Sequence, residues 1–295
     1  MALIRYPGAK AKLLDGILGQ MPDEYVVPLI AAPDVHSVEP FFGSGAIGLE
    51  VMRRMHHEAR ITIADADIGI ASLWRSVRNH PQELLAKVME YTPTTDSFYR
   101  LKEMDGQFTD EVDTGFRKLA LHRISVSGFG AMAGGPIGGR DQQGDYKVGC
   151  RWRPHKIRLQ VQELHKRMKA FANMEILCAD VFDVLHDANE TTSRHSLTFV
   201  YLDPPYYEKG DQLYAIKFSP LQHERLAGVL LNADFAWAAS YDDHDEIRRL
   251  YAGCDVRRLE ITYCNAVCRD PMRRKNHEVL ILPAPKTAGI CHAAG

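Results

Sequence analysis

The sequence lacks long apolar runs, paired cysteines and an excess of charge of either sign. No apolar run approaches the roughly 18 residues that span a bilayer, and residues 1–12 lack the apolar stretch of a secretory signal. The six cysteines form no CxxC pair, so we expect reduced thiols and no metal site. The formal net charge is −2, which means that any surface for nucleic acid has to be local. These absences predict an intracellular protein with no membrane partner and no metal requirement.

Short apolar segments alternate along the chain with longer segments of helical period. Strands are expected at residues 38–42, 61–64, 175–178, 197–202 and 235–239. Their hydrophobicity is continuous rather than alternating, which is typical of parallel strands buried on both faces. Two further strands, at residues 256–263 and 278–282, are predicted to form a hairpin. The pattern predicts an α/β fold with a doubly wound parallel sheet.

The alternation of strands and helices stops between residues 81 and 170. Helices are expected there at residues 96–104, 114–125 and 155–169. Between them, residues 128–139 include six glycines in twelve positions, too many for a helix interior. We therefore predict a core domain of residues 1–80 plus 171–283, an insertion of residues 81–170, and a flexible tail of residues 284–295.

A glycine-rich turn follows the first core strand. Gly43-Ser44-Gly45-Ala46-Ile47-Gly48 precedes a predicted helix over residues 46–55, and its glycines let a ligand approach the backbone. Asp65 ends the second strand, where a carboxylate can accept hydrogen bonds from ribose hydroxyls. These two features suit a nicotinamide dehydrogenase as well as an S-adenosylmethionine enzyme.

The motif Asp203-Pro204-Pro205-Tyr206 follows the apolar strand at residues 197–202. Consecutive prolines end the strand pairing and fix the backbone near φ −65°. The Asp203 carboxylate and the Pro204 carbonyl are then two rigid acceptors for both hydrogens of an exocyclic amino group, and Tyr206 provides a ring on which a base can stack. A dehydrogenase leaves this motif unexplained and has no evident proton-transfer pair.

Three blocks together resemble the Dam-like DNA adenine methyltransferases, the D12 class with the α-type motif order. They are Arg5-Tyr6-Pro7-Gly8-Ala9-Lys10, Glu39-Pro40-Phe41-Phe42-Gly43-Ser44-Gly45 and Asp203-Pro204-Pro205-Tyr206, in the family's order and with a long insertion before the last. The family often has Trp at position 6 and Gly at position 9, and both replacements here keep the physical property. The resemblance implies a Rossmann-like S-adenosylmethionine-dependent methyltransferase sheet with a helical and loop target-recognition insertion.

The resemblance also implies roles for individual residues. The expected catalytic residues are Asp203, Pro204 and Tyr206. The expected contacts of S-adenosyl-L-methionine are Tyr6, Lys10, Glu39, Phe41, Gly43, Gly45, Asp65, Asp180, Val181 and Asp203. The reaction expected is site-specific methylation of adenine N6 in double-stranded DNA, by a monomer in the cytoplasm of a bacterial or phage-infected cell.

Positive charge is concentrated within the insertion. Residues 147–169 contain eight basic residues and one acidic residue, a density that can supply phosphate contacts. Arg151-Trp152-Arg153 adds an aromatic side chain to this charge, and residues 123–139 match the family's target-recognition region. The expected DNA contacts are Arg123, Arg151, Trp152, Arg153, Lys156, Arg273, Arg274 and Lys275.

Other readings of the same residues stay open at this point. A methyltransferase that acts on cytosine N4 in DNA, or on an amino group in RNA, would use the same chemistry. For methylation at cytosine C5, by contrast, a Pro-Cys pair is expected, and the sequence lacks it. A non-catalytic DNA-binding relative would have no need of Lys10, Asp65, Asp203 and Tyr206.

Overall fold

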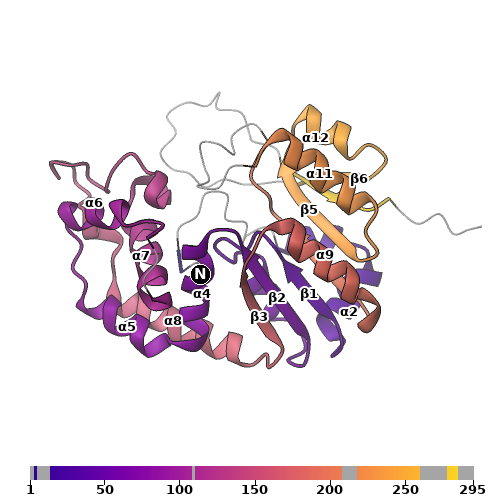
Figure 1. Cartoon of the computed structure of the whole chain (residues 1–295), viewed down its shortest axis with the longest axis horizontal. Helices are drawn as coiled ribbons and strands as arrows, with labels where there is room; N and C mark the ends of the chain where they lie inside the picture. The colour runs from indigo at the N-terminus through magenta and orange to yellow at the C-terminus, as the bar shows by residue number, and fades with distance from the viewer. Residues whose placement is uncertain (1–2, 5–13, 108–109, 208–217, 260–277, 285–295) are drawn as a thin grey trace, which may run out of the picture.

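The computed structural model describes residues 3–4, 14–107, 110–207, 218–259 and 278–284 (Figure 1). Its centre is a seven-stranded sheet in the order β3-β2-β1-β4-β5-β7-β6. The strands are β1 (His36–Glu39), β2 (Arg60–Asp65), β3 (Met174–Cys178), β4 (Thr198–Leu202), β5 (Ala236–Asp242), β6 (Asp255–Leu259) and β7 (Glu278–Leu282). Strands β1 to β5 are parallel, and β7 runs antiparallel to both β5 and β6. The predicted α/β class and the pairing of the last two strands are confirmed.

The strand order reverses between β1 and β4, the two central neighbours in the sheet. In open α/β sheets, ligands bind beyond the carboxyl ends of the strands at such a reversal, because the connections leave in opposite directions and open a crevice. The motifs at Glu39 and Asp203 both lie at this position.

Both faces of the sheet are covered, as the continuous hydrophobicity predicted. On β4, Phe199 and Tyr201 pack into one hydrophobic cluster and Val200 and Leu202 into another, because successive strand side chains point to opposite faces. The first cluster includes side chains of α1 (Leu14–Gln20), α2 (Asp23–Ala31), α3 (Gly48–Met52) and α4 (Ile68–Asn79). The second includes side chains of α9 (Val181–Thr191), α11 (Pro220–Leu231) and α12 (Asp245–Leu250).

The insertion forms a helical group at one side of the sheet, next to α4 (Figure 1). It consists of α5 (Pro81–Glu90), α6 (Thr95–Glu103), α7 (Glu111–Ile124) and α8 (Pro154–Lys169), with short 3-10 turns between α7 and α8. The three helices predicted there are confirmed, and α5 is an additional one. The insertion shares a hydrophobic cluster with the core, since Leu119 and Val161 belong to the same cluster as Ile61 of β2.

Helices α4 and α7 approach each other closely at Gly115. A Cβ atom at this position would lie 2.7 Å from the Leu73 Cα, so only glycine allows the two backbones to come this near. The insertion is therefore held directly against the helix that follows β2.

Candidate active site

Three acidic side chains stand at the carboxyl ends of adjacent parallel strands. Glu39 ends β1, Asp65 ends β2 and Asp203 follows β4 directly. Because β2, β1 and β4 are neighbours in the sheet, these carboxyl groups share one edge. The structure thus brings together three site residues that are far apart in the sequence.

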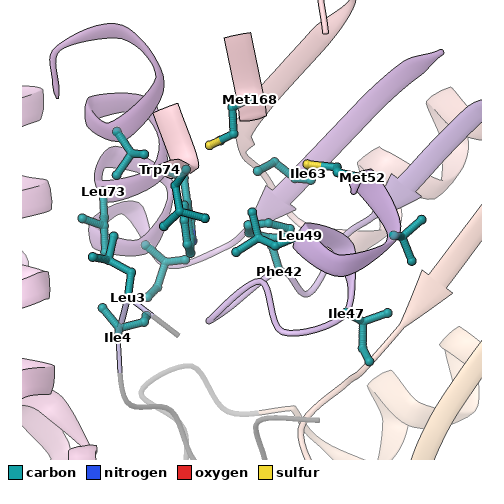
Figure 2. Packing of buried hydrophobic residues seen from close by; sticks show 14 of the residues in the cluster. Leu3, Ile4, Phe42, Ile47, Leu49, Met52, Ile63, Leu73, Trp74 and Met168 are labelled. Carbon is teal, nitrogen blue, oxygen red and sulfur yellow. The ribbon is translucent and has the colours of Figure 1, made fainter. Parts of the chain in front are cut away.

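The glycine-rich turn after β1 is clamped from two sides. Gly43 and Gly45 have φ values of 47° and 67°, in the region that favours glycine. The Gly43 N–H donates to Asp65 Oδ2 at 2.9 Å, and the Gly43 carbonyl accepts from Trp74 Nε1 at 2.9 Å. Figure 2 shows Trp74 on α4 beside Phe42, and their rings meet edge to face at 5.2 Å. The helix after this turn begins only at Gly48, two residues later than predicted.

Asp65 joins this turn to the segment after β2. Its Oδ1 accepts from the Asp67 N–H at 2.9 Å while its Oδ2 accepts from Gly43. Burial, together with the charge of Asp67, raises the pKa of Asp65 to about 7, although these N–H donors and Lys118 favour the charged form. Each carboxylate oxygen can accept a second hydrogen bond, so Asp65 can hold the turn and a hydroxyl group at the same time.

Glu39 is almost fully buried, with 6% of its surface exposed. Burial and the negative charge of Asp203 raise the pKa of Glu39 well above its usual value, against a hydrogen bond from the Gly48 N–H that lowers it. A Cβ atom at Gly48 would collide with Glu39 Oε2, so the carboxyl fits only beneath a glycine. Two carboxyl groups in one site push their protonation apart, and burial together with the charge of Asp203 favours the neutral form of Glu39.

Asp203 is supported by the neighbouring strand. The Ser240 hydroxyl on β5 lies 3.2 Å from Asp203 Oδ1 and 2.9 Å from the Tyr201 hydroxyl. Ser240 is buried, as are Pro204 and Pro205. Asp203 therefore follows a rigid strand end, and the orientation of its carboxylate is constrained.

Tyr206 is held by a buried side chain of β7. Its hydroxyl donates to Glu278 Oε1 on β7 at 2.6 Å, and Glu278 is buried. Sequence reasoning missed both Ser240 and Glu278, because no motif marks them and only the pairing of β7 with β5 brings Glu278 to this edge.

Three aromatic side chains pack against one another near the carboxyl end of β1. The Phe41 ring meets Phe218 edge to face at 5.6 Å, and Phe218 stacks on Phe182 at 6.4 Å. Asp180 caps α9 by accepting from the Phe182 N–H at 2.9 Å, and Val181 is buried behind it. The two phenylalanines Phe182 and Phe218 were not singled out in the sequence, where isolated aromatics carry no signal of proximity.

Three of the expected DNA contacts are exposed. Arg151 ends a 3-10 turn, Arg153 follows it, and Lys156 lies in the first turns of α8. These three residues are close in sequence and their side chains are exposed to solvent, so they can reach DNA phosphates.

Trp152 lies between these residues but is buried, contrary to the prediction that it contacts DNA. Only 7% of it is exposed, its indole N–H donates to the Tyr91 carbonyl at 3.1 Å, and its ring packs edge to face on Tyr91 and Phe116. The side chain is part of the core of the insertion, because an indole gains more from burial with a satisfied N–H than from exposure. It is therefore removed from the expected DNA contacts.

Arg123 is also buried, contrary to the prediction that it contacts DNA. It is 9% exposed, its Nε donates to the Leu3 carbonyl at 2.8 Å, and its Nη2 donates to Gln160 Oε1 at 2.7 Å. The guanidinium thus ties α7 to Leu3 and to α8, and its burial leaves little of it accessible to DNA.

We predict that Arg123→Met lowers the free energy of unfolding by about 2 kcal/mol, because buried acceptors lose a charged donor. Denaturant unfolding measures this loss. The salt dependence of DNA binding should stay as in the wild type, and a reduced slope would return Arg123 to the interface.

The remaining expected residues, Tyr6, Lys10, Arg273, Arg274 and Lys275, lie outside the described residues. Among the helices that the structure describes, none has the length and hydrophobicity required to cross a membrane. In the same part of the chain, no three His, Cys, Asp or Glu side chains gather as a metal site would require.

One family model matches most of the chain. The model of the D12 class N6 adenine-specific DNA methyltransferases matches residues 6–266, a range that includes the glycine-rich turn, the insertion and Asp203. No curated protein matches the sequence.

Proposed function

Because the chain belongs to the D12 class of N6 adenine-specific DNA methyltransferases and methylates adenine in DNA, we propose that the reaction takes place at the sheet edge shared by Glu39, Asp65 and Asp203, with S-adenosylmethionine as the methyl donor. The observation that carries this proposal is the position of Asp203. It stands at the strand-order reversal, braced by Ser240, on the same edge as the clamped glycine turn.

The described residues fit this cofactor. Gly43 and Gly45 let a ligand approach the backbone, and Asp65 keeps acceptor capacity for ribose hydroxyls. Asp180 and Val181 begin α9 next to the end of β2, where the Ala179 N–H donates to the Asp65 carbonyl at 3.3 Å, and they would flank the adenine of the cofactor. Glu39 and Phe41 would border the methionyl part, with Tyr6 and Lys10 of the N-terminal block. When bound, S-adenosylmethionine supplies an electrophilic methyl group on a sulfonium.

Asp203 and the Pro204 carbonyl would accept the two hydrogens of the adenine amino group. This holds the nitrogen lone pair in line for attack, and positioning of this kind contributes much of an enzyme's acceleration. The nitrogen would gain the methyl group as the bond between that group and sulfur breaks, which makes the nitrogen positive and the sulfur neutral. The Asp203 carboxylate would stabilise the positive charge until one N–H proton is released to solvent. The raised pKa of Glu39 favours its neutral form, which limits the negative charge next to Asp203.

Tyr206 would stack on the target base. The adenine must leave the helix to be reached, which costs a few kcal/mol, and stacking on an aromatic ring returns about 1–3 kcal/mol. The hydrogen bond to Glu278 fixes the tyrosine hydroxyl, so little freedom of the ring remains to be lost.

On the DNA side, Arg151, Arg153 and Lys156 would contact phosphates, joined by Arg273, Arg274 and Lys275. In this proposal, residues 1–80 plus 171–283 form the catalytic methyltransferase domain and residues 81–170 recognise the target. Of the tail predicted at residues 284–295, residues 285–295 lie outside the described residues. We propose that the enzyme acts as a monomer on double-stranded DNA in the cytoplasm.

Sequencing of modified bases in DNA from cells that express the protein tests the function directly. We expect N6-methyladenine in one sequence context, and none above background in cells that express Asp203→Ala. Modified cytosine, or the same signal from both proteins, would contradict the proposal.

A further inference from the structure

Resting on the proposed function, we propose that Lys118 is a positioning residue for the cofactor site. From helix α7 of the insertion, it reaches the turn between β2 and α4 and holds Asp67, which in turn holds Asp65. Cofactor binding then depends on a contact made by the insertion.

The Asp67 side chain has two separate tasks. Its Oδ1 caps α4 by accepting from the N–H groups of Gly69, at 2.8 Å, and Ile70, at 3.3 Å. Its Oδ2 forms an ion pair with Lys118 Nζ at 2.5 Å. The carboxylate is therefore fixed by the helix start on one side and by the insertion on the other.

Lys118 is buried, with 5% of its side chain exposed. Burial lowers the pKa of Lys118, but the charges of Asp67 and Asp105 outweigh this effect and raise the pKa above its usual value. Asp105 Oδ2 lies 3.9 Å from the ammonium. A buried cation of this kind is stable only with its partners, and its removal leaves their charges uncompensated.

An unbroken series of contacts runs from Lys118 to the glycine-rich turn. Lys118 binds the Asp67 carboxylate, the Asp67 N–H donates to Asp65 Oδ1, and Asp65 Oδ2 accepts from the Gly43 N–H. Asp65 is thus held between the segment that Lys118 fixes and the turn at which the cofactor is proposed to bind.

The lysine side chain packs against the start of α4. A Cβ atom at Gly69 would lie 2.9 Å from Lys118 Cδ, so the aliphatic chain of the lysine passes directly over the start of α4. The approach of the two backbones at Gly115 holds this geometry from the other end.

Loss of the ammonium would place Asp65 and Asp67 next to each other without a neutralising charge. Asp67 would then turn toward water or leave its capping position, and the Asp67 N–H would no longer be held at Asp65. We expect weaker cofactor binding, while the exposed basic residues that are proposed to bind DNA stay unchanged.

The test compares two variants, Lys118→Met and Arg117→Met. Arg117 is a buried cation at the adjacent position of α7. It donates to the carbonyls of Met104, at 3.0 Å, and Gln107, at 2.8 Å, in the connection between α6 and α7. Titration calorimetry with S-adenosylmethionine gives the cofactor Kd, fluorescence anisotropy gives DNA affinity, and thermal unfolding gives the loss of stability. We expect Lys118→Met to raise the cofactor Kd on the order of tenfold with unchanged DNA affinity. Arg117→Met should lose comparable stability with a Kd within about twofold of the wild type.

Two further variants keep the test decisive if Lys118→Met does not fold. Asp67→Asn retains an oxygen for the helix cap but removes the charge of the pair, and it should also raise the cofactor Kd. Lys118→Arg keeps the charge and should restore most of the affinity. Cofactor binding by Lys118→Met or Asp67→Asn at wild-type affinity, or equal weakening in Arg117→Met, would overturn the inference. Absence of cofactor binding in the wild type would instead contradict the proposed function.

Discussion

Asp203→Ala is expected to lower the rate of methyl transfer by at least about 10²–10³-fold, while S-adenosylmethionine still binds. The substitution removes a preorganised acceptor from the position where charge develops, an effect of that size in other enzymes. It also removes one of the two groups that align the amine. Single-turnover kinetics on methylated and unmethylated DNA, together with calorimetric titration of the cofactor, separate the chemical step from binding.

Ser240→Ala is the matched comparison for this experiment. It removes the hydroxyl that lies 3.2 Å from Asp203 Oδ1 and leaves the carboxylate itself in place. Because one hydrogen bond contributes about 1 kcal/mol, we expect a loss of about fivefold in rate. Full activity of Asp203→Ala would remove the carboxylate from the reaction, and equal losses in both variants would assign the effect to strand packing.

Replacement of both Arg151 and Arg153 by Gln is expected to weaken DNA binding and to flatten its dependence on salt. Each phosphate contact releases condensed counterions, so the loss of two contacts should reduce the slope of log K against log salt concentration by about 1.8. Binding isotherms at several salt concentrations measure this slope. The effect should appear on DNA of any sequence, because phosphate contacts carry no direct sequence information.

The double substitution Lys166→Gln and Lys169→Gln is the control, since it removes the same charge from the other end of α8. Both lysines are exposed in the last turn of that helix, where positive charge complements the helix dipole. Their replacement should leave the slope near the wild-type value. Equal slopes for both double variants would show that net charge, and not the segment around Arg151, determines the affinity.

Much of the scaffold follows from the local pattern of the sequence. Four of the five parallel strands, the paired last strands and three helices of the insertion lie close to where continuous hydrophobicity and helical period predict them, since burial on two faces leaves a mark along each strand. The first strand, β1, spans His36–Glu39 and not the predicted residues 38–42. Asp65 and Asp203 could be chosen from the same local pattern, whereas Glu39 is indicated only by the family resemblance. Each of these two aspartates directly ends or follows a strand, and parallel neighbouring strands end at a common edge.

The tertiary structure alone decided which polar and aromatic side chains face inward. Trp152 and Arg123 read as surface residues beside a basic segment, yet one packs on Tyr91 and the other binds the Leu3 carbonyl. Glu278 under Tyr206 and Lys118 under Asp67 leave no local signal either, because their partners are 72 and 51 positions away along the chain. A sequence records the burial of a whole strand through its repeated pattern. A single buried charge or ring is defined by the partner that satisfies it, and that partner is known only once the chain has folded.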